Sequence, residues 1–204
     1  RGLGDVYKRQ DLKERAGMNE EQVRHAVSMI RTTMEMVEQL PQPVIAAING
    51  IALGGGTELS LACDFRIAAE SASLGLTETT LAIIPGAGGT QRLPRLIGVG
   101  RAKELIYTGR RISAKEAKEY GLVEFVVPAH LLEEKAIEIA EKIASNGPIA
   151  VRLAKEAISN GIQVDLHTGL QMEKQAYEGV IHTKDRLEGL QAFKEKRTPM
   201  YKGE

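Results

Sequence analysis

The chain has 204 residues with 27 Lys and Arg against 27 Asp and Glu, so it carries no formal net charge. This balance gives no electrostatic reason to expect a nucleic acid or an anionic membrane as a partner. A single cysteine, Cys63, excludes an internal disulfide framework and fits a reducing compartment, so a cytoplasmic location is expected. No apolar run reaches membrane-spanning length, and no membrane partner is expected.

The opening decapeptide, RGLGDVYKRQ, has neither helical nor strand periodicity. Its segment DVYKRQ resembles the translation of a transposon adapter used in sequencing libraries. We therefore interpret residues 1–10 as a non-native leader and expect the native N-terminal strands to be missing. Residues 11–140 are then a partial α/β core, and residues 141–204 are a C-terminal helical region.

A helix is predicted over residues 20–40, where apolar side chains recur at helical spacing. Asn19 precedes it as an N-cap, and Gln22 follows three residues later, as in a capping box. After this helix the pattern predicts a strand buried on both faces, a short helix and a second strand. These elements cover residues 44–48, 56–63 and 65–69.

The later elements are mainly helical. The helix in GTQRLPRLIG is expected to take Thr90 as its cap and to hold Pro94 in its first turn. A capping box from Ser113 to Glu116 begins another helix, which ends at Gly121. A last strand is predicted over 122–127, and four helices follow, from about Leu132 to Ile143 and over 148–159, 165–181 and 184–196.

The stretch IALGGGTELSLACD, residues 51–64, sets three glycines at the start of the short helix. Glycines let a ligand approach the backbone closely, and the first amides of a helix lack internal partners and lie at its positive end. Such a site suits an anion, or an oxygen that becomes anionic during a reaction. A phosphate loop is excluded because no Lys-Ser/Thr pair follows.

Glu58 lies three residues after Gly55, so its side chain is expected near the face of the Gly55 amide. The rest of the helix is apolar enough to be interior, and an isolated buried carboxylate costs several kcal/mol unless it is paired or protonated. Glu58 is therefore a candidate acid or base with a raised pKa. The alternative is a glutamate at a helix N-terminus that merely favours the dipole.

A second stretch, LGLTETTLAIIPGAGGTQRL, covers residues 74–93. It holds Glu78 ahead of an apolar turn and a second glycine cluster, formed by Gly86, Gly88 and Gly89. Two carboxylates, each beside a glycine-rich bend, indicate a shared pocket. Paired carboxylates suit the addition or removal of water, where one takes a proton while the other delivers one.

These two stretches resemble the signature motifs of the crotonase superfamily of enoyl-CoA hydratases and isomerases, and the resemblance covers residues 11–204. It implies an α/β spiral of ββα units followed by helices that build homotrimers, often paired into hexamers. It also implies that the Gly55 amide is an oxyanion-hole donor to an acyl-CoA thioester, and that Glu58 and Glu78 are the catalytic glutamates. Many isomerases, hydrolases and decarboxylases of the superfamily lack one or both.

Both glutamates together favour hydration of a 2-enoyl-CoA to a 3-hydroxyacyl-CoA in fatty-acid oxidation, with Glu58 as the base and Glu78 as the proton donor. Coenzyme A is then part of the substrate, and no separate cofactor or metal is expected. The second oxyanion-hole amide would fall at Gln10, within the opening decapeptide.

The resemblance further marks five substrate-binding residues: Gly54, Gly86, Lys13, Phe193 and Lys196. Lys13 matches a position near the CoA moiety, although a solvated lysine is the commoner explanation. Phe193 and Lys196 match positions that reach a neighbouring subunit's CoA, against the alternative of an ordinary charged terminal helix.

Three other functions stay open. The segment TKDRLEGLQAFKEKR and the final YKGE also resemble the methylglutaconyl-CoA hydratases of leucine degradation. RNA binding is reported for relatives of that subgroup, but neutral charge and 4% aromatic residues argue against it here. A catalytically inactive assembly module is the third alternative, and retention of both glutamates argues against it.

Overall fold

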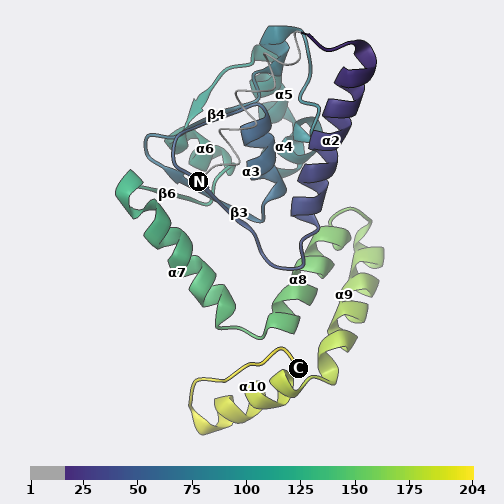
Figure 1. Cartoon of the computed structure of the whole chain (residues 1–204). Helices are drawn as coiled ribbons and strands as arrows, with labels where there is room; N and C mark the ends of the chain where they lie inside the picture. Colours follow the sequence, from purple (N-terminus) through teal and green to yellow (C-terminus); the bar gives the residue numbers. More distant parts are fainter. Residues whose placement is uncertain (1–16) are drawn as a thin grey trace. The chain divides into compact units, whose positions relative to one another are not determined.

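The computed structural model describes residues 17–204, which fall into two compact units (Figure 1). The first unit contains residues 17–40 and 44–136, and the second contains residues 41–43 and 137–204. The predicted leader, residues 1–10, and the candidate residue Lys13 lie outside the described residues. None of the helices within residues 17–204 is long and apolar enough to cross a membrane.

Helix α2 (Glu20–Glu38) opens the first unit and begins where the sequence predicts. Both hydrogen bonds of the capping box are present. The Gln22 amide donates to Asn19 Oδ1 at 3.0 Å, and the Asn19 amide donates to Gln22 Oε1 at 2.9 Å. These bonds satisfy helix-end donors that have no intrahelical acceptor.

Six short strands of the first unit form two three-stranded sheets. One sheet has the order β1-β3-β6 and is parallel throughout. The other has the order β2-β4-β5, with β2 and β4 parallel and β5 antiparallel to β4. The strands are β1 (Ile45–Ile48), β2 (Ile51–Leu53), β3 (Phe65–Ala69), β4 (Ser73–Gly75), β5 (Ile112–Ser113) and β6 (Phe125–Val127).

The path of the chain through these sheets is a spiral. Strands β1 and β2 enter different sheets, helix α3 (Gly55–Ala62) follows, and β3 and β4 then extend the same two sheets in turn. Each turn of the spiral therefore contributes a ββ pair and a helix, as the crotonase resemblance implies. The mixed α/β fold class predicted from the sequence is confirmed.

The remaining helices that the structure describes lie between the later strands or after β6. They are η1 (Glu78–Leu81), α4 (Gly89–Ile97), α5 (Val99–Thr108), α6 (Ala114–Tyr120), η2 (Ala129–Leu131), α7 (Leu132–Ala144), α8 (Pro148–Gly161), α9 (Leu166–Ile181) and α10 (Lys184–Glu195). The sequence analysis did not predict β2, β4, β5 or α5. Three of these are strands of two or three residues, too short to show a clear alternation.

Three local predictions are wrong. Thr90 does not cap its helix, because Gly88 is the N-cap with a φ of 109° and α4 begins at Gly89. Pro94 therefore sits at the sixth helical position instead of in the first turn. Strand β1 is only partly buried, with Ala47 exposed, instead of buried on both faces.

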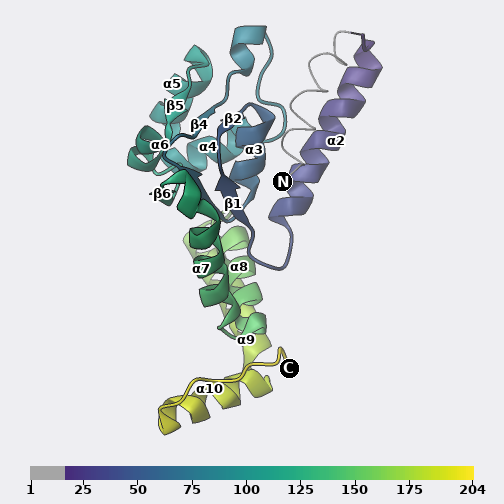
Figure 2. The ribbon, with the colours of Figure 1, turned by 60° about the vertical axis from the view of Figure 1, so that its left-hand side comes forward.

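The core of the first unit consists of aliphatic side chains from both sheets and from the helices that follow them. Its largest fully buried members are Ile67, Leu74, Leu76, Leu93, Leu105, Ile112 and Leu122. A smaller cluster of Met34, Ala62 and Ala87 joins α2, α3 and the turn before α4. Helix α2 accordingly lies alongside α3 in both ribbon views (Figure 1 and Figure 2).

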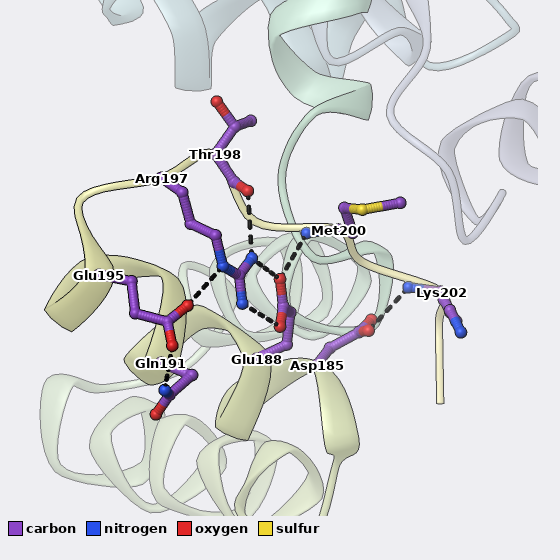
Figure 3. Close-up of polar contacts among 8 residues, drawn as sticks. All are labelled: Asp185, Glu188, Gln191, Glu195, Arg197, Thr198, Met200 and Lys202. Atoms are coloured by element: carbon purple, nitrogen blue, oxygen red, sulfur yellow. Dashed lines mark hydrogen bonds and ion pairs between the residues drawn. The ribbon is translucent and has the colours of Figure 1, made fainter.

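The second unit contains a helical hairpin and a folded-back tail. Helices α8 and α9 meet where a Cβ built on Gly169 would lie only 3.2 Å from the carbonyl oxygen of Gly161. The last residues of the chain lie against α10 (Figure 3). There the buried carboxylate of Asp185 accepts the amides of Lys202 at 2.7 Å and Gly203 at 2.8 Å.

Candidate active site

The site is built on the first turn of α3, which follows directly from β2. Gly54 is the N-cap with a φ of 54° and a ψ of −122°, a conformation that favours glycine. Its amide donates to the carbonyl oxygen of Gly75 in β4 at 2.9 Å, which fixes the start of the helix against the neighbouring strand. The helix end is therefore anchored to the sheet by its backbone.

The Gly55 amide is the candidate oxyanion-hole donor. It is the first helical residue, and no acceptor within residues 17–204 receives its N–H. A Cβ built on Gly55 would meet no atom of residues 17–204 within 4 Å, so none of these residues fills the space beside its Cα. An oxygen of a ligand could therefore approach this amide at the positive end of the helix.

Glu58 is buried on the same first turn, with an exposed fraction of 4%. Its Oε1 accepts two backbone N–H groups, from Ala87 at 2.8 Å and from Gly89 at 2.8 Å. Hydrogen bonds of this kind favour the ionised carboxylate. The carboxylate at this helix end is thus also held by a second segment of the chain.

The glycines of the second motif allow that close approach. A Cβ on Gly89 would lie 3.0 Å from Glu58 Oε1, 2.8 Å from Leu76 Cδ1 and 2.9 Å from Pro85 Cβ. A side chain at this position would therefore push the turn away from the carboxylate. Gly86 faces α2, since its Cβ would lie 3.1 Å from Val27 Cγ1.

Glu78, which precedes the glycines of the second motif, also lies at the N-terminal end of α3. It is the first residue of η1, which Thr79 fixes by donating its hydroxyl to the carbonyl oxygen of Ile106 at 2.6 Å. A Cβ built on Gly54 would lie 2.9 Å from Glu78 Oε1. The structure thus places Glu78 against the N-cap of the helix that carries Glu58.

Two of the predicted binding residues, Phe193 and Lys196, lie in the second unit. Phe193 on α10 has an exposed fraction of 85%, and Lys196 follows as the C-cap of that helix with a φ of 56°. Among residues 17–204, no group of three or more His, Cys, Asp and Glu side chains is placed to hold a metal ion.

Thr57 is a structural residue of the site that the sequence analysis missed. Its buried hydroxyl donates to the carbonyl oxygen of Ala52 at 2.6 Å and accepts the Gly75 amide at 3.1 Å. It therefore joins β2, α3 and β4 beside the Gly55 amide. The available signal was a hydroxyl side chain in a largely apolar helix, although Ser60 gives the same signal three residues later.

Comparison with known proteins identifies the class to which this fold and site belong. The family model for enoyl-CoA hydratase/isomerase matches residues 9–204. A crystal structure of an enoyl-CoA hydratase from Bacillus anthracis is 99% identical in sequence and aligns with a TM-score of 0.94, over 95% of this chain and 75% of that chain.

Two curated relatives extend the comparison. The protein provisionally named enoyl-CoA hydratase/isomerase YngF, from Bacillus subtilis (strain 168), is 65% identical over 95% of this chain and 74% of its own length. The human protein named mitochondrial methylglutaconyl-CoA hydratase is 55% identical over 95% of this chain. The chain spans 58% of that human relative.

The chain therefore belongs to the enoyl-CoA hydratase/isomerase family. This membership confirms the resemblance to the crotonase superfamily, the family fold and the prediction of an enzyme. The roles of individual site residues stay predictions.

Proposed function

We propose that this chain is a hydro-lyase that adds water across the 2,3 double bond of a 2-enoyl-CoA. Family membership supports the substrate class. The observation that carries the proposal is the placement of two carboxylates at one helix end. Glu58 lies on the first turn of α3, and Glu78 lies against Gly54 at its N-cap.

In this proposal the thioester oxygen of the substrate accepts the N–H of Gly55. Negative charge develops on that oxygen as water adds to the conjugated double bond, and the positive end of α3 stabilises it. One such donor contributes about 3 kcal/mol to transition-state stabilisation. The second donor is expected at Gln10, outside the described residues.

The two glutamates divide the proton transfers. Glu58 accepts a proton from a water molecule, whose oxygen forms the new bond to C3. Glu78 delivers a proton to C2. The amides of Ala87 and Gly89 favour the ionised form of Glu58, which is the form a general base requires.

The hydration assay tests this assignment. The purified chain is mixed with crotonyl-CoA, and the loss of ultraviolet absorbance of the enoyl thioester is followed. Glu58→Gln and Glu78→Gln are each expected to lower kcat by roughly 10²–10⁴-fold, the usual contribution of a positioned acid or base. Glu70→Gln, at an exposed glutamate after β3, is the matched control. Wild-type rates in both site variants would refute the assignment.

Methylglutaconyl-CoA is a second candidate substrate within the same chemistry. The 55% identity to the human methylglutaconyl-CoA hydratase favours it, as does the likeness of the C-terminal segment. Values of kcat/KM for the two thioesters, measured side by side, distinguish fatty-acid oxidation from leucine degradation. The better substrate is the thioester with the higher kcat/KM.

We also propose a homo-oligomer, a trimer or a hexamer. Large apolar side chains are exposed in the second unit, including Leu166 on α9 and Phe193 on α10. Contiguous apolar surface is typical of protein interfaces. Light scattering after size-exclusion chromatography checks the mass. The cytoplasmic location stays a prediction, and the human relative is named as mitochondrial.

A further inference from the structure

The turn that holds Glu58 is itself held from behind by two arginines. Ala87 and Gly89 direct their amides at the carboxylate. The carbonyl oxygen of Gly86 accepts Arg31 Nε at 3.2 Å, and that of Ala87 accepts Arg92 Nη1 at 3.0 Å. The turn therefore has an anion on its inner side and two cations on its outer side.

The arrangement strengthens the amides as donors. The carbonyl of Gly86 and the amide of Ala87 belong to one peptide group. The Arg31 guanidinium, which donates to that carbonyl oxygen, therefore polarises the Ala87 N–H that faces Glu58. The Gly89 amide belongs to a different peptide group, the one that joins Gly88 to Gly89. Its partner carbonyl, that of Gly88, accepts the backbone amide of Arg92 at 2.9 Å in the first turn of α4.

Arg92 is fixed on its far side by α2. Its Nη2 lies 2.6 Å from Glu38 Oε2, and its Nε lies 3.3 Å from the same oxygen. The guanidinium covers Gly88, where a Cβ would collide with it. Only 15% of the Arg92 side chain is exposed, against 46% for Glu38.

Apolar side chains also hold the 86–89 turn in place. Met34 of α2, Ala62 of α3 and Ala87 of the turn form one buried cluster, with Ile30 packed against it. Helix α2 thus contacts the turn directly through the apolar cluster, and indirectly through Glu38, whose partner Arg92 on α4 bonds to the Ala87 carbonyl. The same turn cannot shift without breaking contacts to α2.

We propose that Arg92, oriented by Glu38, is a positioning residue for Glu58. It acts through the 86–89 turn: it fixes the Ala87 peptide and thereby the direction from which the two amides hold the carboxylate. Arg92 itself needs no contact with substrate. The consequence for catalysis rests on the proposed hydration, whereas the consequence for the turn does not.

The kinetic test uses the full chain with Arg92→Gln, Arg92→Lys and Glu38→Gln. Arg92→Gln is expected to lower kcat about tenfold with KM within twofold of wild type, because a misplaced base slows chemistry without weakening binding. Arg92→Lys should restore only part of the loss, since an ammonium cannot contact Ala87 and Glu38 as a fork. Glu38→Gln should give a smaller fall in kcat of the same kind.

Arg95→Gln is the matched control. Arg95 lies three residues further along α4. Within residues 17–204 its Nη1 bonds only to Gln91 of the same helix, at 2.8 Å to the carbonyl oxygen and 3.3 Å to Oε1. This variant should leave kcat and KM unchanged.

Amide hydrogen exchange at Ala87 and Gly89 provides a readout independent of activity. Arg92→Gln should speed exchange at both amides about tenfold, because the turn opens locally more often. Arg95→Gln should not. If Arg92→Gln does not fold, the milder Glu38→Gln decides by the same two readouts.

The outcomes separate the two proposals. Unchanged exchange at Ala87 and Gly89 in a folded Arg92→Gln variant overturns the positioning role, whatever the kinetics. Faster exchange with an unchanged kcat in an active chain also overturns it. Faster exchange in a chain whose wild type hydrates no enoyl-CoA supports the positioning of Glu58 and counts against the proposed function alone.

Discussion

The guanidinium of Arg66 closes the C-terminal end of α3, where its Nη1 donates to the carbonyl oxygen of Cys63 at 2.9 Å. The same nitrogen lies 3.2 Å from the carbonyl oxygen of Ser60, and Nε donates to the carbonyl oxygen of Leu122 at 2.9 Å. The Glu124 carboxylate lies 2.6 Å from Nη2. The helix whose first turn carries the site is thus fixed at its other end by a buried cation.

Arg66→Met should therefore destabilise the chain strongly. It removes the guanidinium donor from the carbonyl oxygens of Cys63 and Leu122 and from Glu124 Oε1, which is expected to lower the free energy of unfolding by about 3–5 kcal/mol. Urea unfolding measures the change. Glu124→Gln should lose less, because 31% of the Glu124 side chain is exposed. Equal stability of Arg66→Met and wild type would contradict the structural role.

Gly54→Ala should impair the site as well as the backbone. The φ of 54° disfavours a side chain, and the new Cβ would lie 2.9 Å from Glu78 Oε1. We expect a loss of about 1–3 kcal/mol in the free energy of unfolding, because a positive φ combined with a ψ of −122° is a region that glycine alone adopts readily, together with a large loss of hydration.

Gly121→Ala separates the two effects of that substitution. Gly121 also has a positive φ, of 79°, but its Cβ would meet nothing within 4 Å. As a left-handed alanine with a ψ of 19°, it should lose about 1–2 kcal/mol of the free energy of unfolding and keep wild-type hydration. Equal activity losses in the two variants would show that backbone strain, and not displacement of Glu78, is responsible.

Gly169→Ala should destabilise the α8–α9 hairpin although alanine is the better helix former. Its Cβ would lie 3.2 Å from the carbonyl oxygen of Gly161, which is backbone and cannot rotate away. Gly100→Ala in α5 is the matched control, since its Cβ meets nothing within 4 Å. That control should gain about 0.5 kcal/mol from helix propensity. Thermal unfolding compares the two, and a gain at Gly169 would contradict the close approach.

Docking of the C-terminal tail should depend on pH. The Arg197 guanidinium, and secondly the Met200 amide, lower the pKa of Glu188 from 4.5 to about 2. Figure 3 shows this carboxylate between Arg197 and the Met200 amide, with bonds of 2.6 Å and 2.8 Å. Because the pKa is depressed in the folded chain, the contribution is complete above about pH 4.5 and is lost as the pH falls through about 2.

Amide exchange at Met200 measures that docking. Its protection should decrease as the pH is lowered across this interval, after correction for the intrinsic pH dependence of exchange. Glu188→Gln should have reduced protection at neutral pH and little further change on acidification. Protection at Met200 that is the same in both proteins would argue against Glu188 as the anchor.

The helical elements were largely predictable because their signals are local. The capping pair Asn19 and Gln22 marked the start of α2, and Gly121 marked the end of α6, where it adopts a φ of 79°. The Ser113 hydroxyl accepts the Glu116 amide as predicted, while the Glu116 carboxylate pairs with Arg110 at 2.8 Å. The strands that were not predicted are defined by pairing between segments that lie far apart in the sequence, such as Ile51 with Ser73.

By itself, the sequence determined the two glycine-rich motifs, the glutamates Glu58 and Glu78, and the family to which they point. Residue type and spacing carry that information without knowledge of contacts. Only the tertiary structure decided that Glu58 is held by the amides of Ala87 and Gly89, and that Arg92 and Glu38 secure that turn from behind. Backbone amides carry no sequence signal of their own, and residues 38, 58 and 92 come together only because the chain folds α2, α3 and the turn around one buried cluster.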